Sequence, residues 1–168
     1  LQNARRAGAM RIEIHYDATA QVLRVEDDGR GLDDFQKLLS FHESGWDAAT
    51  STEERPFGVG FSKCLYASTR CIVASNRQRV DIDTAAALAK ASIEVESITE
   101  AVAGTRIELH GVDLPDLGNR IESLCLGFPV EVLFNGKPLL RRFAAANLAT
   151  MASPMGTVHL TGTDRKST

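Results

Sequence analysis

Four stretches of the chain alternate apolar and polar residues with the period of two that a half-buried β-strand requires. They cover residues 11–16, 22–27, 92–98 and 105–112. A polar turn at 17–21 joins the first pair, and a turn containing Gly104 is expected to join the second pair. Hairpins that alternate in this way bury one face and expose the other, so the pattern predicts a largely antiparallel sheet with one covered face.

Segments with helical spacing are interleaved with these strands and supply the cover for that face. The helices are expected at residues 1–9, 34–41, 59–68, 84–90 and 117–128, and further strands at 70–75, 79–83 and 130–140. Residues 42–57 have no periodic apolar pattern and are interpreted as a loop. The order of elements predicts an α+β fold, a two-layer α/β sandwich whose mixed, mostly antiparallel sheet carries its helices on one face.

Two details of the C-terminal third are specific enough to test. The helix at 117–128 is expected to pack through Ile121, Leu124 and Leu126. The Asn135-Gly136 pair is a strong signal for a tight hairpin turn. Beyond residue 142 the pattern fades, and residues 143–168 are expected to be a tail or the start of a following domain.

Composition and charge narrow the functional classes. The net charge of −3 gives no reason to expect a nucleic acid as the partner, and no apolar run approaches the ~20 residues that cross a bilayer. The three cysteines, Cys64, Cys71 and Cys125, show no C-x-x-C spacing, and the four histidines are scattered. This argues against a disulfide framework or a zinc site and favours a reducing, cytoplasmic location.

The stretch RPFGVGFSKCLYAS at 55–68 places two glycines one residue apart directly before an apolar helical run. A helix N-terminus opened by glycines is suited to bind a phosphate, because its free N–H groups and dipole face the anion. The chain has no G-x-x-x-x-G-K-[ST] motif, and GVGFSK lacks the third glycine and preceding strand of a dinucleotide fingerprint. A phosphate at Gly58 and Gly60 therefore needs support from elsewhere in the chain.

That support is the sequence DDGRG at 27–31, where Asp27 ends a strand and two glycines follow. A carboxylate there is suited to accept a hydrogen bond from the amino group of adenine, whereas guanine presents a carbonyl oxygen instead. A charge-assisted hydrogen bond contributes about 1.5–3 kcal/mol, so one carboxylate could discriminate by about tenfold or more. The alternative is a plain turn that caps the next helix.

Four motifs in order resemble the GHKL superfamily of gyrase B subunits, ninety-kilodalton heat-shock chaperones, sensor histidine kinases and MutL. They are NARRAGA at 3–9, DDGRG at 27–31, FGVGFSKCLYAS at 57–68 and GTRIEL at 104–109. The glycine turn looks most like the chaperone branch, while NARRAGA looks equally like the MutL version. The resemblance implies a Bergerat-type fold, with an N-terminally truncated ATP-binding domain at residues 1–142.

Carried over residue by residue, the resemblance implies that Asn3 coordinates a Mg²⁺ ion and that Asp27 takes the adenine amine. It further implies that Thr105 supports adenine through water and that residues 42–57 form a lid over ATP. Backbone approach to the nucleotide and its phosphates is implied for Gly29, Gly31, Gly58, Val59, Gly60 and Phe61. Lys63 is either a phosphate contact or a solvated side chain.

The resemblance also has departures. The general-base glutamate of the family stands four residues before the asparagine, which here falls ahead of Leu1, and Arg6 occupies a position where chaperones and MutL carry aspartate. The first hypothesis is an ATPase domain that drives a larger, chaperone-like protein with a protein client or as a homodimer. The alternatives are a non-catalytic, ATP-gated interaction module, a MutL-like DNA-repair ATPase domain and, with less support, a sensor kinase.

Overall fold

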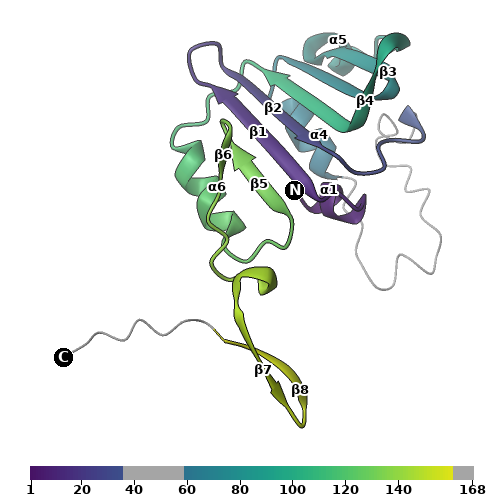
Figure 1. Ribbon diagram of the computed structural model, residues 1–168. Helices are drawn as coiled ribbons and strands as arrows, with labels where there is room; N and C mark the ends of the chain where they lie inside the picture. The colour runs from purple at the N-terminus through teal and green to yellow at the C-terminus, as the bar shows by residue number, and fades with distance from the viewer. Residues whose placement is uncertain (36–58, 161–168) are drawn as a thin grey trace.

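Six strands form one twisted sheet in the order β3-β4-β2-β1-β5-β6 (Figure 1). The computed structural model describes residues 1–35 and 59–160. The strands are β1 (Arg11–Asp17), β2 (Val22–Asp27), β3 (Arg70–Asp83), β4 (Val95–His110), β5 (Glu131–Phe134) and β6 (Lys137–Pro138).

The pairing makes the sheet mixed and mostly antiparallel. The strands β1 and β2 form the expected hairpin, β4 pairs antiparallel with both β2 and β3, and β5 runs parallel to β1. Asn135 and Gly136, with φ of 47° and 76°, join β5 to β6. Two successive positive φ angles match the hairpin turn that the Asn-Gly pair predicted.

The helices are α1 (Gln2–Arg6), α4 (Val59–Tyr66), α5 (Thr84–Leu88) and α6 (Leu117–Cys125). One core cluster packs α1 and α6 over β1 and β5, through Ala4, Ile12, Ile14, Ile121, Cys125 and Val132. A second packs α4 over β3 and β4, through Leu65, Cys71, Val73, Val80 and Leu109. Leu23 of β2 packs against both clusters, so the helices cover the same face of the sheet.

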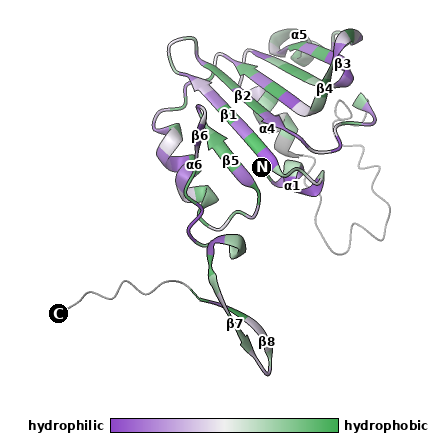
Figure 2. Ribbon diagram, viewed as in Figure 1, coloured by the Kyte–Doolittle hydropathy of each residue, from purple (hydrophilic) through white to green (hydrophobic). Residues whose placement is uncertain are grey.

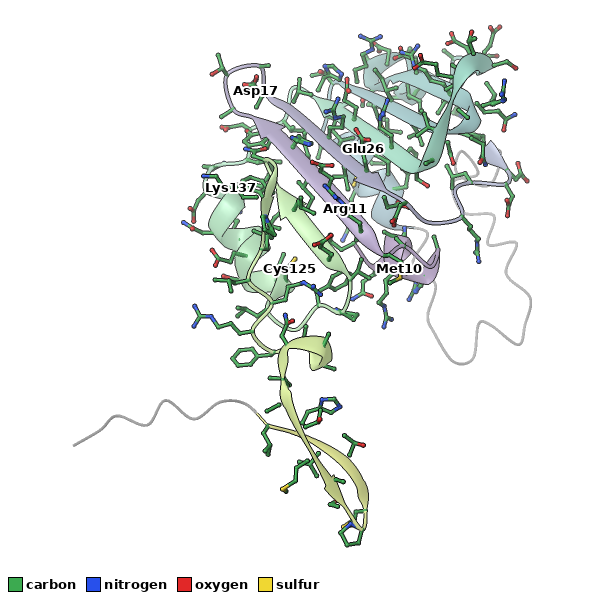
Figure 3. The ribbon with its side chains drawn as sticks, in the orientation of Figure 1. Met10, Arg11, Asp17, Glu26, Cys125 and Lys137 are labelled. Atoms are coloured by element: carbon green, nitrogen blue, oxygen red, sulfur yellow. The ribbon has the colours of Figure 1, made fainter. Side chains whose placement is uncertain are left out.

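The opposite face of the sheet carries charged side chains. Glu26 of β2 lies 3.0 Å from the Nε atoms of both Arg24 and Arg106, and is labelled in Figure 3. These charges alternate along the strands with the apolar residues of the covered face, as the period of two requires. The predicted α+β fold with helices on one face is therefore confirmed.

Two pairs of expected strands are single long strands in the structure. The segments expected at 70–75 and 79–83 form one strand, β3, with register shifts next to Asn76, whose φ is 54°. Likewise β4 runs through Gly104 instead of turning there, with φ of 64° at that glycine. Bulges and a left-handed residue interrupt the alternation as a turn does, and this explains both errors.

Two helix predictions also need correction. Leu124 is 73% exposed, whereas Cys125 is buried between α6 and β5 (Figure 3). The first helix ends at Arg6, short of the expected residue 9, and Gly8 follows with φ of 76°. Residues 36–41 of one expected helix, and the whole loop 42–57, lie outside the described residues.

The segment after residue 142 contains a second, separate sheet. A short 3₁₀ helix, η1 (Ala145–Asn147), leads into the hairpin of β7 (Ala149–Ser153) and β8 (Gly156–Leu160), which extends away from the main sheet (Figure 1). Figure 2 shows few strongly hydrophilic residues along it. Its residues are nearly all exposed, and Met155 is 99% exposed. Within the described ranges, no helix is long and apolar enough to cross a membrane.

Candidate functional site

Asp27 is the last residue of β2, as the sequence predicted, and its carboxylate is held by backbone groups. Its Oδ1 accepts a hydrogen bond of 2.9 Å from the N–H of Gly29, and the backbone N–H of Thr105, its register partner on β4, lies near enough to the carboxylate to act on its pKa. Burial raises the pKa of Asp27 above its ordinary value, while these two N–H groups lower it. An ionised carboxylate offers about four lone-pair sites, so acceptor capacity remains for a ligand.

The turn that follows Asp27 packs too closely for side chains. A Cβ on Gly29 would lie 2.8 Å from the Cβ of Ala7, and one on Gly31 would lie 2.5 Å from the Oγ of Ser75. Gly31 also has a φ of 78°. Both glycines therefore let α1 and β3 close on this turn, in addition to any approach that they allow to a nucleotide.

Gly104, which opens the GTRIEL motif and was itself expected to lie in a turn, belongs to the same site. A Cβ at this position would overlap the carbonyl oxygen of Asp27 and come within 2.9 Å of the Gly29 nitrogen. Its missing side chain thus allows β4 to lie directly against the backbone around Asp27 and brings Thr105 into register. A glycine inside an alternating strand marks such a close approach, so a signal was present.

Ser75 and Asn76 also reach the site, from the irregular part of β3. The hydroxyl of Ser75 donates to the Gly104 carbonyl at 2.5 Å and accepts from the Leu32 N–H at 2.8 Å. The Asn76 side-chain amide donates to the Leu32 carbonyl at 3.1 Å. The sequence reasoning missed both residues, because Ser75 only ends the strand expected at 70–75 and Asn76 only follows it, and neither belongs to a local motif.

The first helix is fastened to the same turn by backbone contacts. The N–H of Arg30 donates to the carbonyl of Ala7 at 3.0 Å. Oδ1 of Asp28 accepts from the N–H groups of Met10 and Arg11, at 2.8 and 2.9 Å, where β1 begins (Figure 3). Asp28 therefore anchors the start of β1, while its neighbour Asp27 faces Gly29 and Thr105. The first and second sequence motifs thus meet in space.

The remaining predicted residues are only partly placed. Asn3 is exposed on α1, and Lys63 is exposed on α4. The glycine turn meets α4 at Val59, the first residue of the helix, with Gly60 next, while Gly58 lies outside the described residues. Phe61 is half-buried and packs against the second core cluster, so its side chain serves the core.

Two hollows among the described residues do not include Asp27 in their linings. One, of about 300 Å³, lies between the end of β3 and α5, and its lining includes Asp81, Ala87 and Ile93. The other, of about 240 Å³, is lined by residues that include Phe35 and Gln78. The site at Asp27 is thus defined by its hydrogen bonds and close backbone contacts.

Comparison with known proteins agrees with this arrangement. The family model described as "Histidine kinase-, DNA gyrase B-, and HSP90-like ATPase" matches residues 1–113. No curated protein sequence matches the chain.

The solved structures that match this chain include the following three. The ATPase region of Saccharomyces cerevisiae topoisomerase II gives a TM-score of 0.56 at 16% identity, covering 81% of this chain and 45% of that one. The same region bound to ICRF-187 (dexrazoxane) gives 0.57 at 17% identity, covering 83% and 46%. The Aquifex aeolicus MutL ATPase domain complexed with ADP gives 0.47 at 15% identity, covering 83% and 58%.

This chain therefore spans roughly half the length of these solved structures. At such identities the likeness concerns the fold, and the family model supplies the assignment. The match over residues 1–113 includes α1, the Asp27 turn and the Gly104-Thr105 segment, which the structure brings together. The chain belongs to the histidine kinase-, DNA gyrase B- and HSP90-like ATPase family, the GHKL superfamily that its ordered motifs resemble.

Proposed function

We propose that this chain binds ATP and that the Asp27 carboxylate selects adenine by accepting a hydrogen bond from its amino group. The supporting observation is the half-buried carboxylate at the end of β2, oriented by the N–H groups of Gly29 and Thr105. These backbone groups leave the carboxylate pre-oriented before a ligand arrives, which reduces the entropy lost on binding. Thr105 is positioned next to Asp27 by the β2–β4 register and is proposed to support the same base through water.

The phosphates are proposed to lie between α1 and the start of α4. Gly58, Val59, Gly60 and Phe61 would offer backbone N–H groups there, and the positive end of the helix dipole favours an anion. Asn3 is proposed as the protein ligand of a Mg²⁺ ion. A side-chain amide oxygen fits this ion, which commonly takes one or two protein ligands and completes its shell with phosphates and water. Bound Mg²⁺ would neutralise charge on the phosphates.

We further propose that nucleotide occupancy drives a larger, chaperone-like protein in the cytoplasm, as a homodimer or with a protein client. In this proposal residues 42–57 close as a lid over ATP, and turnover uses a glutamate that precedes Asn3 in the full-length protein. Without that base the hydrolytic step is expected to be slower by about 100-fold or more. An ATP-gated interaction module and a MutL-like ATPase domain are the alternatives.

The hairpin of β7 and β8 supports the boundary near residue 142. An isolated two-stranded hairpin is marginally stable in water, and this one exposes Met151, Met155, Val158 and Leu160. We propose that residues 143–168 begin a following unit and that more of the protein covers the hairpin. Such a unit would connect the nucleotide site to the rest of the molecule.

Calorimetric titration with a non-hydrolysable ATP analogue and Mg²⁺ tests the proposal, with the matching GTP analogue as the second ligand. The Asp27→Asn variant is expected to bind the adenine ligand about tenfold more weakly or worse. The matched control is Asp28→Asn, which makes the same charge change one residue away and keeps an oxygen acceptor for the N–H groups of Met10 and Arg11.

Binding of the control is expected to stay within about twofold of the wild type, since no ligand contact is assigned to Asp28. Equal affinity for the two bases, or an equal loss in both variants, would contradict the role given to Asp27. The absence of saturable binding at millimolar ligand would contradict ATP binding itself.

A further inference from the structure

We propose that Ser75 is a positioning residue of the nucleotide site, which fixes the two backbone segments that hold the Asp27 carboxylate. This inference rests on the proposed function, because it concerns how the adenine-selecting group is kept in place. Ser75 lies on β3, outside the four motifs that pointed to the family, and is assigned no contact with the nucleotide. Its role is therefore exerted through main-chain groups.

The hydroxyl of Ser75 forms a bridge between two segments that are distant in sequence. It donates to the carbonyl of Gly104, at 2.5 Å, and accepts from the N–H of Leu32, at 2.8 Å. Gly104 directly precedes Thr105, whose N–H reaches the Asp27 carboxylate, and Leu32 ends the turn that contains the other donor, Gly29. One hydroxyl thus links the segment that carries Thr105 to the segment that carries Gly29.

The burial of Ser75 makes this bridge difficult to replace. Its side chain is fully buried, and it is one of three buried polar residues in the part of the chain that the structure describes. A hydroxyl donates and accepts at once, so it gives a hydrogen-bond partner to both a carbonyl and an N–H. Alanine would remove both hydrogen bonds next to Asp27, and the two segments are expected to separate.

A second contact from β3 strengthens the bridge. Asn76 has a φ of 54°, which shifts the register of β3, and its side chain donates to the Leu32 carbonyl at 3.1 Å. The N–H and the carbonyl of Leu32 are therefore both held by adjacent residues of β3. The irregularity in β3 thus directs two side chains at one residue of the Asp27 turn, which is a recognised use of a β-bulge.

The decisive experiment compares Ser75→Ala with Ser68→Ala in the full 168-residue chain. Ser68 is also buried, and its hydroxyl shares its one proton between the carbonyls of Cys64 and Leu65, at 3.1 Å from each, but these lie at the end of α4. Calorimetry with the non-hydrolysable ATP and GTP analogues gives the affinity for each base, and thermal unfolding gives the stability of each variant.

We expect Ser75→Ala to bind the ATP analogue about tenfold more weakly and to lose much of its preference over the GTP analogue. Ser68→Ala is expected to lose comparable stability while keeping both the affinity and the preference. An unchanged preference in Ser75→Ala, or an equal loss in Ser68→Ala, would show that Ser75 is a structural residue and overturn the inference.

Asn76→Gly covers the case in which Ser75→Ala does not fold. Asn76 is exposed and already has a positive φ, so glycine fits this backbone without strain. Loss of its bond to Leu32 is expected to weaken binding of the ATP analogue by about threefold at nearly constant melting temperature. Unchanged affinity in this variant would refute the bridge. Failure of the wild type to bind would instead refute the proposed function, and the bridge with it.

Discussion

Replacing Gly104 with alanine is the most direct test of how the site is built. The substitution places a side chain at a φ of 64°, which costs about 1–2 kcal/mol for a residue other than glycine. The new Cβ also overlaps the carbonyl oxygen of Asp27, a backbone atom that no change of rotamer can move. The forced shift of β4 against β2 adds about 1–3 kcal/mol, the usual range for overpacking.

The free energy of unfolding is therefore expected to fall by about 2–5 kcal/mol, and the melting temperature by roughly 5–15 °C for a chain of this size. Circular dichroism during heating measures this directly. The matched control is Gly136→Ala, which has a φ of 76° and no atom within 4 Å of the added Cβ. The Gly136→Ala variant therefore has only the cost of a side chain at positive φ, with no steric overlap. Equal losses in the two variants would refute the claim that β4 is pressed against Asp27.

Three further predictions concern acid groups and the hairpin. Burial raises the pKa of Asp27 above its ordinary value of 3.8, so the stability of the wild type falls as the pH rises from 3.8 through the raised pKa. The Asp27→Asn variant is therefore expected to have a higher melting temperature than the wild type at neutral pH and an equal one in strong acid. An equal difference in melting temperature at both pH values would contradict this reasoning. The effect of Asp81 has the opposite sign, because its hydrogen bond to Arg70 lowers its pKa. The stability that the ionised Asp81 carboxylate contributes is therefore lost as the pH falls through the lowered pKa. Asp81→Asn should therefore melt below the wild type at neutral pH but not in strong acid, whereas equal losses would indicate a packing defect. Deleting residues 149–168 is expected to change the melting temperature by less than about 2 °C, since both strands of the hairpin are exposed, and a fall of about 5 °C would show that they support the core.

The strands of the sheet were predictable because local alternation reports burial directly. Residues such as Ile12 and Ile14 face the core and alternate with polar neighbours, and the β1–β2 hairpin follows from that pattern. The pattern does not report whether an interruption is a turn or a bulge. Asn76 and Gly104 both interrupt a strand with a positive φ, and each strand nevertheless continues beyond them.

Helix boundaries and facing residues were less predictable for a similar reason. The helix at 117–125 has apolar residues at several neighbouring positions, and its true inward face is set by contact with β5. Tertiary packing therefore chose Cys125 over Leu124, although leucine is the more hydrophobic side chain. Local spacing alone could not make that choice.

The residues of the candidate site also differ in whether the local sequence reveals them. Asp27 and its two following glycines were visible because a carboxylate and glycines at a strand end form an unusual local combination. Ser75 was invisible, because its importance comes from long-range register: it lies opposite Thr105 on β4 and over the turn at Leu32. No spacing within β3 encodes a contact with residues more than forty positions earlier.

These features also explain why unfavourable local geometry gathers at this end of the sheet. A raised pKa at Asp27 and the positive φ of Asn76 each oppose folding locally. Buried apolar residues on both sides of β2 supply the compensating stability, since each fully buried aliphatic side chain contributes about 1.5–3 kcal/mol. If Asp27 served only to cap a turn, its burial would destabilise the folded protein without contributing to function. A carboxylate kept partly dehydrated and oriented before the ligand arrives is instead what selective recognition of an amino group requires.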